Sequence, residues 1–160
     1  MLNLHIRAIA AADVSAIAHL AEQGFKDSYQ FDWQANAQAL LKASQEGRAT
    51  VAVAEMEGEV VSYCNLRAWP VGGWIDQIVV DEKHRRKGIG QALLDYIVDK
   101  AKTKGYWKIS LIVSASDTAA IAFYEKYGFQ AVGRMKDEIK KGQDGIFMSY
   151  VVSYALHPNK

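Results

Sequence analysis

The chain has 160 residues, of which 50% are hydrophobic, 11% aromatic and 23% charged, a length and composition that suit one domain with a full apolar core. Its 19 Lys and Arg against 18 Asp and Glu leave a formal charge of +1, which argues against a general nucleic-acid binder or a polybasic membrane tether. The single cysteine, Cys64, excludes an internal disulfide, a cysteine-based zinc finger and an iron–sulfur cluster.

Nothing in the sequence indicates a membrane or secretory segment. The uninterrupted apolar runs are far shorter than the ~20 residues that a bilayer span requires, and the N-terminal residues lack the basic, apolar and small-residue order of a signal peptide. With two prolines and no repeat or polar linker, residues 1–160 are expected to form a single domain. We therefore expect a cytoplasmic protein with no membrane partner.

Hydrophobic periodicity predicts four strands and two helices in the first half of the chain. Alternation at Leu4, Ile6 and Ala8 indicates a short strand, and Asp13 is a typical N-cap for the helix that follows. Glu57-Gly58 predicts a tight hairpin between two apolar strands. The predicted elements are strands over 3–9, 49–56, 59–69 and 74–80, and helices from 13 to about 23 and over 34–46.

The second half of the chain alternates helices and strands. An amphipathic helix is predicted from Gly88 to the C-terminal cap at Gly105, and a shorter one is closed by Gly128. The other predicted elements are strands over 106–113, 129–135 and 146–156, a helix over 117–126, and a turn over 141–145. This order indicates an α/β (α+β) protein, with a mixed sheet and helices packed on its faces.

The sharpest local motif is a basic segment between a predicted strand and a predicted helix, Arg85-Arg86-Lys87-Gly88-Ile89-Gly90. Its glycines permit a tight turn that brings several N–H groups to one point, and the helix N-terminus adds positive charge. The spacing is neither that of a P-loop nor that of a dinucleotide-binding motif. Two interpretations stay open from these residues alone: an anion cradle suited to a pyrophosphate, and a solvated basic turn.

A second segment, 113–129, contains Ala120, Phe123-Tyr124-Glu125 and Gly128-Phe129. Together the two segments resemble the GNAT superfamily of N-acetyltransferases. Arg85, Gly88 and Gly90 match the family's pyrophosphate loop, the second segment matches its downstream block, and one helix plus one strand separate the two. The recognisable motifs span residues 74–135. The presence of both motifs at the family's separation makes the resemblance specific.

The resemblance implies a mostly antiparallel mixed sheet of about seven strands with about four helices, in which strand 74–80 splays from a parallel neighbour, 106–113. It implies acetyl-CoA as cosubstrate and no metal. The pantetheine arm would pair with the backbone of the splayed strand as an added strand does. The coenzyme-binding positions that it implies are Ile78, Val79, Val80, Arg85, Arg86, Lys87, Gly88, Ile89, Gly90, Gln91, Asp117, Ala120 and Phe123.

Tyr124 is implied to donate a proton to the departing thiolate, a modest aid because a thiol is already a good leaving group. Its helical spacing with Ala120, Phe123 and Tyr127 also suits a core residue. Asp117 stands where the family usually has Asn. Since a carboxylate only accepts hydrogen bonds, Asp117 is either a weakened coenzyme contact or simply the N-cap of its helix.

Asp76 is the first candidate for the general base. It lies on the strand before the basic segment and shares a predicted apolar face with Trp74 and Ile78, which would raise its pKa by desolvation. The alternative is an ion pair with a nearby arginine such as Arg67. His84 is the second candidate base. His5, His19 and His157 show no ligand spacing, and Cys64 is expected to be apolar filler rather than a nucleophile.

The acceptor site is expected in the loop between the first two helices and in the final hairpin. Aromatic and acidic side chains suit an ammonium group, although the same aromatics could only anchor the loop. The candidates are Phe25, Tyr29, Phe31 and Trp33, with Asp27, Asp32, Trp69 and Tyr150. Amino acid, polyamine, aminoglycoside and protein N-terminus stay open as acceptors, and a homodimer through the last strand or a sheet edge is plausible.

Three functions follow from these observations. The first is acetyl transfer from acetyl-CoA to a primary amine of a small molecule or peptide, by direct attack in a ternary complex. The second is a non-catalytic CoA-binding regulatory module, which the substitution at Asp117 and the uncertain base keep open. The third, nucleic-acid binding through residues 84–87, needs a broader basic face than this chain has.

Overall fold

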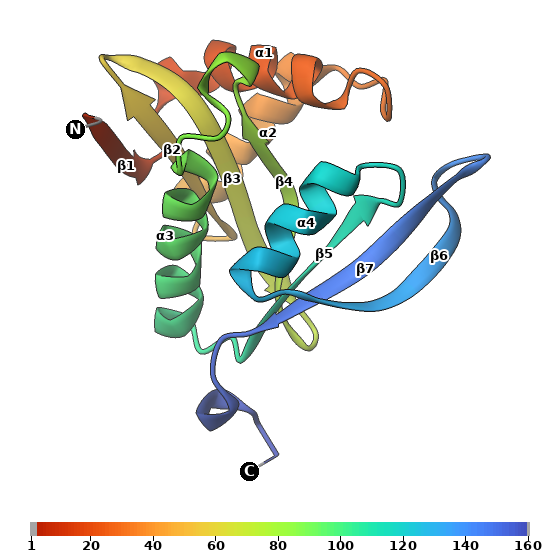
Figure 1. Cartoon of the computed structure of the whole chain (residues 1–160). Helices are drawn as coiled ribbons and strands as arrows, with labels where there is room; N and C mark the ends of the chain where they lie inside the picture. Colours follow the sequence, from red (N-terminus) through yellow and green to blue (C-terminus); the bar gives the residue numbers. More distant parts are fainter. Residues whose placement is uncertain (1–2, 160) are drawn as a thin grey trace. The chain divides into compact units, whose positions relative to one another are not determined.

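The computed structural model describes residues 3–159, and this part of the chain contains seven strands and four α-helices (Figure 1). Residues 1, 2 and 160 of the expected single domain lie outside the described part. The strands are β1 (Leu4–Ala8), β2 (Ala49–Met56), β3 (Glu59–Trp69), β4 (Gly72–Val80), β5 (Lys108–Ser114), β6 (Gln130–Lys140) and β7 (Gln143–Val151). The helices are α1 (Val14–Phe25), α2 (Trp33–Gln45), α3 (Ile89–Thr103) and α4 (Thr118–Tyr127).

The strands form one hydrogen-bonded series in the order β1-β2-β3-β4-β5-β7-β6. The β1–β2, β2–β3, β5–β7 and β6–β7 pairs are antiparallel, and β4–β5 is parallel. The expected mixed, mostly antiparallel sheet with a parallel pair is thereby confirmed. The β4–β5 register joins Gly73 to Ile109 and Trp74 to Ser110; splaying of these strands beyond those pairs stays a prediction.

The chain divides into two compact units. The first comprises the described residues up to Arg67 together with Asp76–Lys100, and the second comprises Ala68–Ile75 and the described residues from Ala101 onward. β4 is therefore shared, since its first half belongs to the second unit and its second half to the first.

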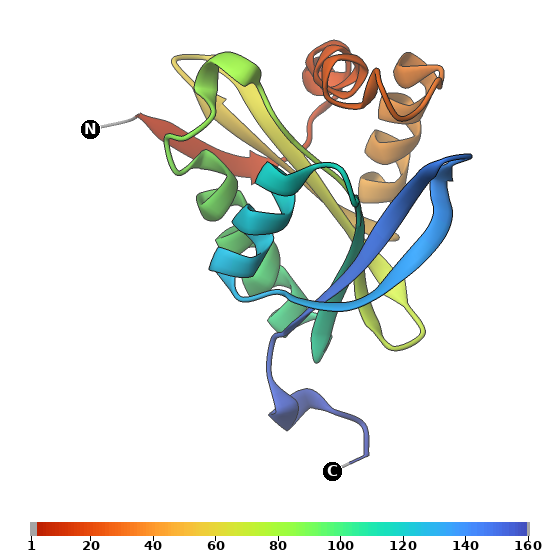
Figure 2. The same cartoon turned by 45° about the vertical axis from the view of Figure 1, so that its right-hand side comes forward.

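In the first unit, two helical layers cover opposite faces of the sheet (Figure 2). α1 and α2 bury Ile17 and Ala37 against Val53 and Tyr63 on one face. On the other face, Ile89 at the start of α3 packs with buried residues of β2 and β3. The two sets alternate along β2, with Val51 and Val53 on one face and Ala54 and Met56 on the other, because successive side chains of a strand point to opposite faces. β2 and β3 are consequently buried on both sides.

The hairpin between β2 and β3 has the predicted turn. Glu57 and Gly58 both have positive φ values, 52° and 83°, which is the requirement for a two-residue turn that matches the twist of the strands. The expected strands over 49–56 and 59–69 agree residue for residue with β2 and β3.

In the second unit, α4 packs on β7 through aromatic rings. Tyr127 lies 5.4 Å from Tyr150 between ring centroids, and Phe129 lies at the same distance from Tyr150. Gly128 ends the helix with φ of 122°, and a Cβ there would lie 3.1 Å from the Tyr150 ring. The close approach of α4 to β7 therefore requires glycine at this position.

The last strand differs from its prediction. β7 runs over Gln143–Val151 rather than 146–156. The N–H groups of Val152 and Ser153 both donate to the carbonyl of Trp107, which ends the ladder, and the Ser153 side chain then caps a short 3-10 turn over Tyr154–Leu156. The apolar residues after 151 suggested a strand because period-two alternation does not show where a partner strand ends.

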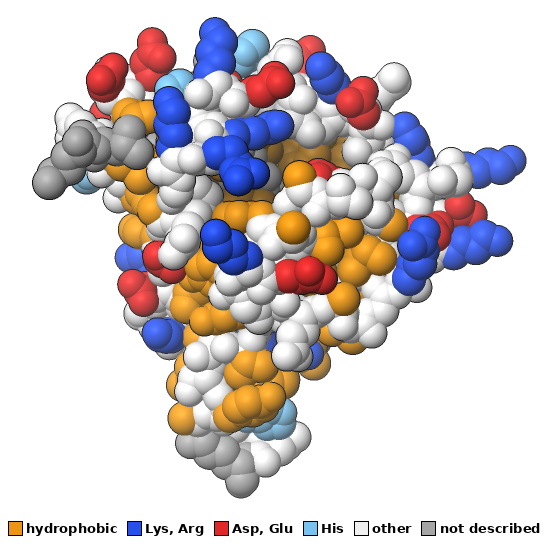
Figure 3. Space-filling model, in the orientation of Figure 1, with side chains coloured by type: hydrophobic (Ala, Val, Ile, Leu, Met, Phe, Trp, Pro, Cys, Tyr) orange, Lys and Arg blue, Asp and Glu red, His pale blue; other side chains and the backbone are white. Residues whose placement is uncertain are grey.

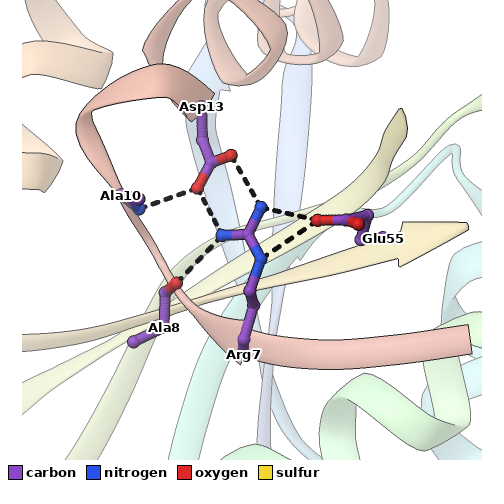
Figure 4. Close-up of polar contacts among 5 residues, drawn as sticks. All are labelled: Arg7, Ala8, Ala10, Asp13 and Glu55. Carbon is purple, nitrogen blue, oxygen red and sulfur yellow. Dashed lines mark hydrogen bonds and ion pairs between the residues drawn. The ribbon is translucent and has the colours of Figure 1, made fainter. Parts of the chain in front are cut away.

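Asp13 also departs from its expected role. It precedes α1, but its side chain accepts no hydrogen bond from that helix. Instead it accepts the Ala10 N–H at 2.7 Å and two bonds from the Arg7 guanidinium, at 2.7 and 3.0 Å (Figure 4). Arg7 also donates to Glu55 at 2.8 and 3.1 Å. This network joins β1 and β2 to the start of α1.

The Arg7 network sets the charge state of its members. Burial alone would raise the pKa of Asp13, but hydrogen bonds from Arg7 and Ala10 and the Arg7 charge outweigh it, so the pKa lies below its ordinary 3.8. The hydrogen bonds to Asp13 and Glu55 raise the pKa of Arg7. Asp13 is therefore ionised at neutral pH and stabilises the fold in that form.

No helix within residues 3–159 has both the length and the apolar character needed to cross a membrane.

We predict that Asp13→Asn lowers the free energy of unfolding by about 1–3 kcal/mol, because it leaves the half-buried Arg7 guanidinium and the Ala10 N–H poorly paired. The measurement is urea denaturation at pH 7. Since the folded pKa of Asp13 is depressed, its contribution is complete above pH 3.8 and is lost below it. The difference in free energy of unfolding between wild type and variant should therefore become smaller as the pH falls below 3.8.

The matched control is Lys42→Met, which removes an exposed ion pair to Glu46 of 3.9 Å and should change stability by at most about 0.5 kcal/mol. Equal losses in the two variants would contradict the role given to the Arg7 network.

Candidate functional site

The basic segment before α3 forms a left-handed bend. Arg86 has φ of 64° and Gly88 has φ of 80°, and such positive values turn successive N–H groups toward one side of the chain. Within residues 3–159, no hydrogen bond is found from the backbone N–H groups of 86–90. Arg85, Arg86 and Lys87 are exposed, and Lys and Arg side chains gather over the segment leading into α3 (Figure 3). The bend has the charge and free donors of an anion cradle.

A His–Asp pair supports this bend from the strand side. His84 Nδ1 lies 2.7 Å from Asp81 Oδ2, and the Asp81 N–H donates to the carbonyl of Val61 on β3 at 2.8 Å. Partial burial would raise the pKa of Asp81, but the hydrogen bond and charge of His84, with Lys83, lower it overall. Asp81 therefore holds His84, the second candidate base, through its Nδ1 atom, and the role of His84 as a base stays a prediction.

The first unit contains a cavity of about 320 Å³ with an aromatic wall. Four rings line it, from Phe25, Tyr29, Phe31 and Trp33. Each packs against two others, with centroid distances from 5.4 to 6.0 Å. Trp33 is 9% exposed and Phe31 is 64% exposed, so the wall runs from the core to solvent. These are the four residues that the sequence singled out for an acceptor.

The opposite side of this cavity is lined by amides. Asn65, which is 2% exposed, accepts the Gln77 N–H at 2.8 Å and donates to Asp76 at 3.1 Å. The Gln77 side chain donates to Asn36 at 3.0 Å and accepts from the buried Tyr63 hydroxyl at 2.8 Å. Burial raises the pKa of Tyr63, so this hydroxyl stays a donor. The network fixes β3, β4 and α2 around the cavity.

Asp76 lies at the edge of this cavity in an ion pair. Its two oxygens accept from Arg67 Nε at 2.7 Å and Nη2 at 3.0 Å, besides the bond from Asn65. The carboxylate is exposed, so the apolar environment expected around it is not found. The alternative expected from the sequence, an ion pair between Asp76 and Arg67, is therefore present.

Four other acceptor candidates do not line the cavity. Asp27 is not among its lining residues, and Asp32 caps α2 by accepting the Ala35 N–H at 2.9 Å. Trp69 and Tyr150 pack inside the second unit, Trp69 with Trp74 and Phe147, and Tyr150 on the α4 aromatics. The sequence alone could not distinguish residues that line the cavity from residues that pack elsewhere or cap a helix.

The downstream motif forms α4 in the second unit. Tyr124 is 7% exposed and packs between Phe123 and Phe129, at centroid distances of 5.3 and 5.4 Å. Asp117 accepts the Ala120 N–H at 3.0 Å, which confirms it as the N-cap of the helix. Tyr124 is therefore held in one orientation by its neighbours.

Sequence reasoning missed Asn36, Asn65 and Gln77. A signal was available for Asn65, since an amide within the apolar run of β3 must find partners when it is buried. The spacing of Asn36 and Gln77 gave no signal, because their contact joins residues 41 positions apart. Cys64 is fully buried, which raises the pKa of its thiol, in agreement with the expected packing role.

Among residues 3–159, no group of three or more His, Cys, Asp and Glu side chains is placed to hold a metal ion.

Known proteins resemble this chain in sequence and fold. The profile of the Acetyltransferase (GNAT) family matches residues 15–129. The chain is 30% identical over 158 residues to an N-alpha-acetyltransferase of Sulfurisphaera tokodaii, a match covering 90% of each protein. It is 35% identical over 79 residues to the ribosomal protein bS18-alanine N-acetyltransferase of Salmonella typhimurium, which covers 48% of this chain and 53% of that protein. The chain thus spans about half the length of this relative.

A solved structure shares the fold. Salmonella typhimurium YncA, with its cofactor acetyl-CoA, superposes with a TM-score of 0.80 at 22% sequence identity, over 94% of this chain and 95% of that one.

We predict that Gly88→Ala lowers the free energy of unfolding by about 1–2 kcal/mol, because an L-residue resists the left-handed conformation. A Cβ at Gly88 would meet nothing within 4 Å, so the loss is conformational only. Gly72→Ala is the comparison variant, since its Cβ would meet the backbone carbonyl of Lys108 in addition to having φ of 142°. Urea denaturation should show the larger loss for Gly72→Ala, and the reverse order would contradict this account.

Proposed function

Because the chain belongs to the GNAT family of acetyltransferases, we propose that it transfers an acetyl group from acetyl-CoA to the α-amine of a peptide. The acceptor class rests on one observation: the carboxylate beside the aromatic cavity, Asp76, is paired with Arg67.

Residues 85–91 are proposed to hold the coenzyme's pyrophosphate. The bend at Arg86 and Gly88 and the free N–H groups after it suit phosphate oxygens, since a helix N-terminus favours negative charge. The basic side chains of Arg85, Arg86 and Lys87 add attraction that salt weakens. On the second unit, Ala120 and Phe123 are proposed to contact the coenzyme, and Asp117 to act mainly as a helix cap.

The backbone of Ile78, Val79 and Val80 is proposed to orient the pantetheine arm by strand addition. The Ser62 hydroxyl donates to the Val79 carbonyl at 2.7 Å, which holds this strand in position. An N–H group of Val79 or Val80 is proposed to polarise the thioester carbonyl as negative charge develops on its oxygen. Acetyl-CoA supplies the activated acetyl group.

The charge of the aromatic cavity argues against a polycationic acceptor. Polyamines and aminoglycosides carry several ammonium groups, and each needs a carboxylate or another acceptor for good recognition. Asp76 is the one carboxylate among the cavity-lining residues within 3–159, and Arg67 already neutralises it. An aromatic wall facing amides suits a peptide, whose first side chain packs on the rings and whose backbone meets Asn and Gln groups.

The acidity of the acceptor amine supports the same class. A peptide α-amine has a pKa near 7.7–8.0, whereas a lysine amine is near 10.4. Near pH 7 about one α-amine in ten is neutral and able to attack, so water suffices to remove the later proton. Asp76 is accordingly proposed to orient Arg67 and Asn65, and any proton it accepts reaches it through water.

Tyr124 is proposed as the general acid that protonates the departing thiolate. The packing of its ring between Phe123 and Phe129 limits the positions its hydroxyl can occupy, which is what a positioned acid requires.

The relatives support an α-amine acceptor, since one is an N-alpha-acetyltransferase and the other acts on an alanine of ribosomal protein bS18. We also propose that the enzyme acts in the cytoplasm, where a ribosomal acceptor like that of this relative is found.

We predict that a peptide with a free N-terminal Ala supports thiol release from acetyl-CoA, and that its kcat/KM exceeds that of an N-blocked lysine peptide by about two orders of magnitude at pH 7. The measurement is a thiol-release assay on both peptides, with spermidine and an aminoglycoside as polycationic acceptors.

Preference for lysine or for a polycation would overturn the acceptor class. Coenzyme-dependent thermal stabilisation with no thiol release from any amine would identify a coenzyme-binding module instead. Asp76→Asn should leave the shape of the pH–rate profile unchanged, and loss of its acidic limb would show that Asp76 takes the proton.

We predict that Tyr124→Phe lowers kcat by about 10²-fold and leaves the affinity for acetyl-CoA, measured by calorimetry, within about threefold. Tyr127→Phe, on the same helix, is the matched control and should keep near-normal turnover. An unchanged kcat in Tyr124→Phe would leave Tyr124 as a packing residue.

A further inference from the structure

Two of the amides that line the aromatic cavity form a hydrogen-bonded chain with a buried tyrosine. Tyr63 is fully buried, and its hydroxyl donates to Gln77 Oε1 at 2.8 Å. Gln77 Nε2 donates in turn to Asn36 Oδ1 at 3.0 Å. All three residues belong to the first unit. Gln77 and Asn36 line the cavity and Tyr63 does not, so the chain connects a core residue to the surface that a ligand meets.

The direction of this chain is fixed at Tyr63. Burial raises the pKa of the Tyr63 hydroxyl, so the hydroxyl stays protonated and needs an acceptor. Within residues 3–159, no hydrogen bond of this hydroxyl is found other than the one to Gln77. If the Gln77 amide were turned round, the buried O–H group would face an N–H group and lose its acceptor. Gln77 therefore keeps its oxygen toward Tyr63 and its nitrogen toward Asn36.

The direction of the chain sets which atom Asn36 offers to a ligand. Its oxygen accepts from Gln77, so the N–H groups of Nδ2 are the ones left. Among residues 3–159, Nδ2 has no hydrogen-bond partner, and it is not a buried atom. Since Asn36 lines the cavity, the cavity presents a donor there, and a ligand atom that meets it must accept a hydrogen bond.

The first residue of a peptide carries such an acceptor close to its amine. Its carbonyl group and its α-amine are attached to the same carbon, so a hydrogen bond to the carbonyl oxygen restricts where the amine can lie. The aromatic rings suit the first side chain, which leaves the backbone oxygen for the amides. A simple amine has no oxygen in that place. A donor at Asn36 would therefore distinguish a peptide from a simple amine.

We propose that Asn36 Nδ2 donates a hydrogen bond to the first carbonyl oxygen of the acceptor peptide, and that Tyr63 is a positioning residue that keeps this amide in the donating orientation. The inference rests on the proposed function, because it assumes that the first residue of a peptide occupies the aromatic cavity. Asn36 is then a specificity residue that touches the acceptor, whereas Tyr63 acts only through Gln77.

The test of Asn36 compares two Ala-first peptides that differ in one atom, the oxygen or a sulfur of the first carbonyl. Sulfur is the weaker acceptor, so we expect the sulfur peptide to have a KM about tenfold higher in the thiol-release assay. Asn36→Ala should raise KM for the oxygen peptide and make the two peptides nearly equal. Gln38→Ala, exposed on α2 outside the cavity lining, is the matched control and should keep the tenfold ratio. A tenfold ratio in Asn36→Ala would overturn the assignment of the donor.

The test of Tyr63 uses the same ratio. In Tyr63→Phe the Gln77 amide is free to turn and to accept from Asn36 Nδ2, so the ratio of the two KM values should fall to about threefold because both orientations are populated. Both peptides are measured on the same variant, so a loss of folded protein cannot change the ratio. Tyr96→Phe, on α3 in the same unit, is the matched control. An unchanged ratio in Tyr63→Phe would overturn the positioning role.

Calorimetry with the two peptides, in the absence of acetyl-CoA, separates this inference from the proposed function. Tighter binding of the oxygen peptide, lost in Asn36→Ala, supports the inference even if no amine is acetylated. Equal affinities of the wild-type protein for the two peptides overturn it. Thiol release with equal KM values for the two peptides would leave the proposed function in place and overturn only this inference.

Discussion

The hydrogen bonds of one buried amide, Asn65, organise the first unit around the aromatic cavity. Asn65 is almost fully buried on β3, and an amide in that position is stable only if its donor and acceptor groups are both paired. Its oxygen accepts the Gln77 N–H and its nitrogen donates to Asp76, so β4 is held in one register beside it. The same bonds orient Asp76 toward Arg67 and place Gln77 against Asn36 and Tyr63. The polar side of the cavity follows from this single requirement.

That arrangement determines what chemistry the cavity supports. A lone carboxylate on an apolar strand face would suit a general base and a strongly basic amine. A carboxylate engaged by Arg67 and Asn65 suits the proposed acceptor, a peptide whose α-amine is partly deprotonated near neutral pH. The four-ring wall suits the first side chain of such a peptide. The basic segment before α3 shows a similar effect of placement. The chain has an overall formal charge of +1, yet Arg85, Arg86 and Lys87 lie together there. Local placement of charge, rather than its total, supports the proposal that this nearly neutral protein binds the coenzyme's phosphates before α3.

The sequence by itself determined the elements and the two motifs. Glu57-Gly58 specified its turn through local φ preferences, Gly128 and Asp117 bounded α4, and the basic segment before α3 had the left-handed bend that its glycine predicted, because each depends on neighbours in the chain. Tertiary structure alone decided that Asp13 binds Arg7 rather than capping α1, that β7 stops at Val151, and that Asp76 pairs with Arg67. The two ion pairs join residues only six and nine positions apart, but they form because the folded sheet brings those side chains together, and the end of β7 depends on where a neighbouring strand ends. Periodicity contains no information about either.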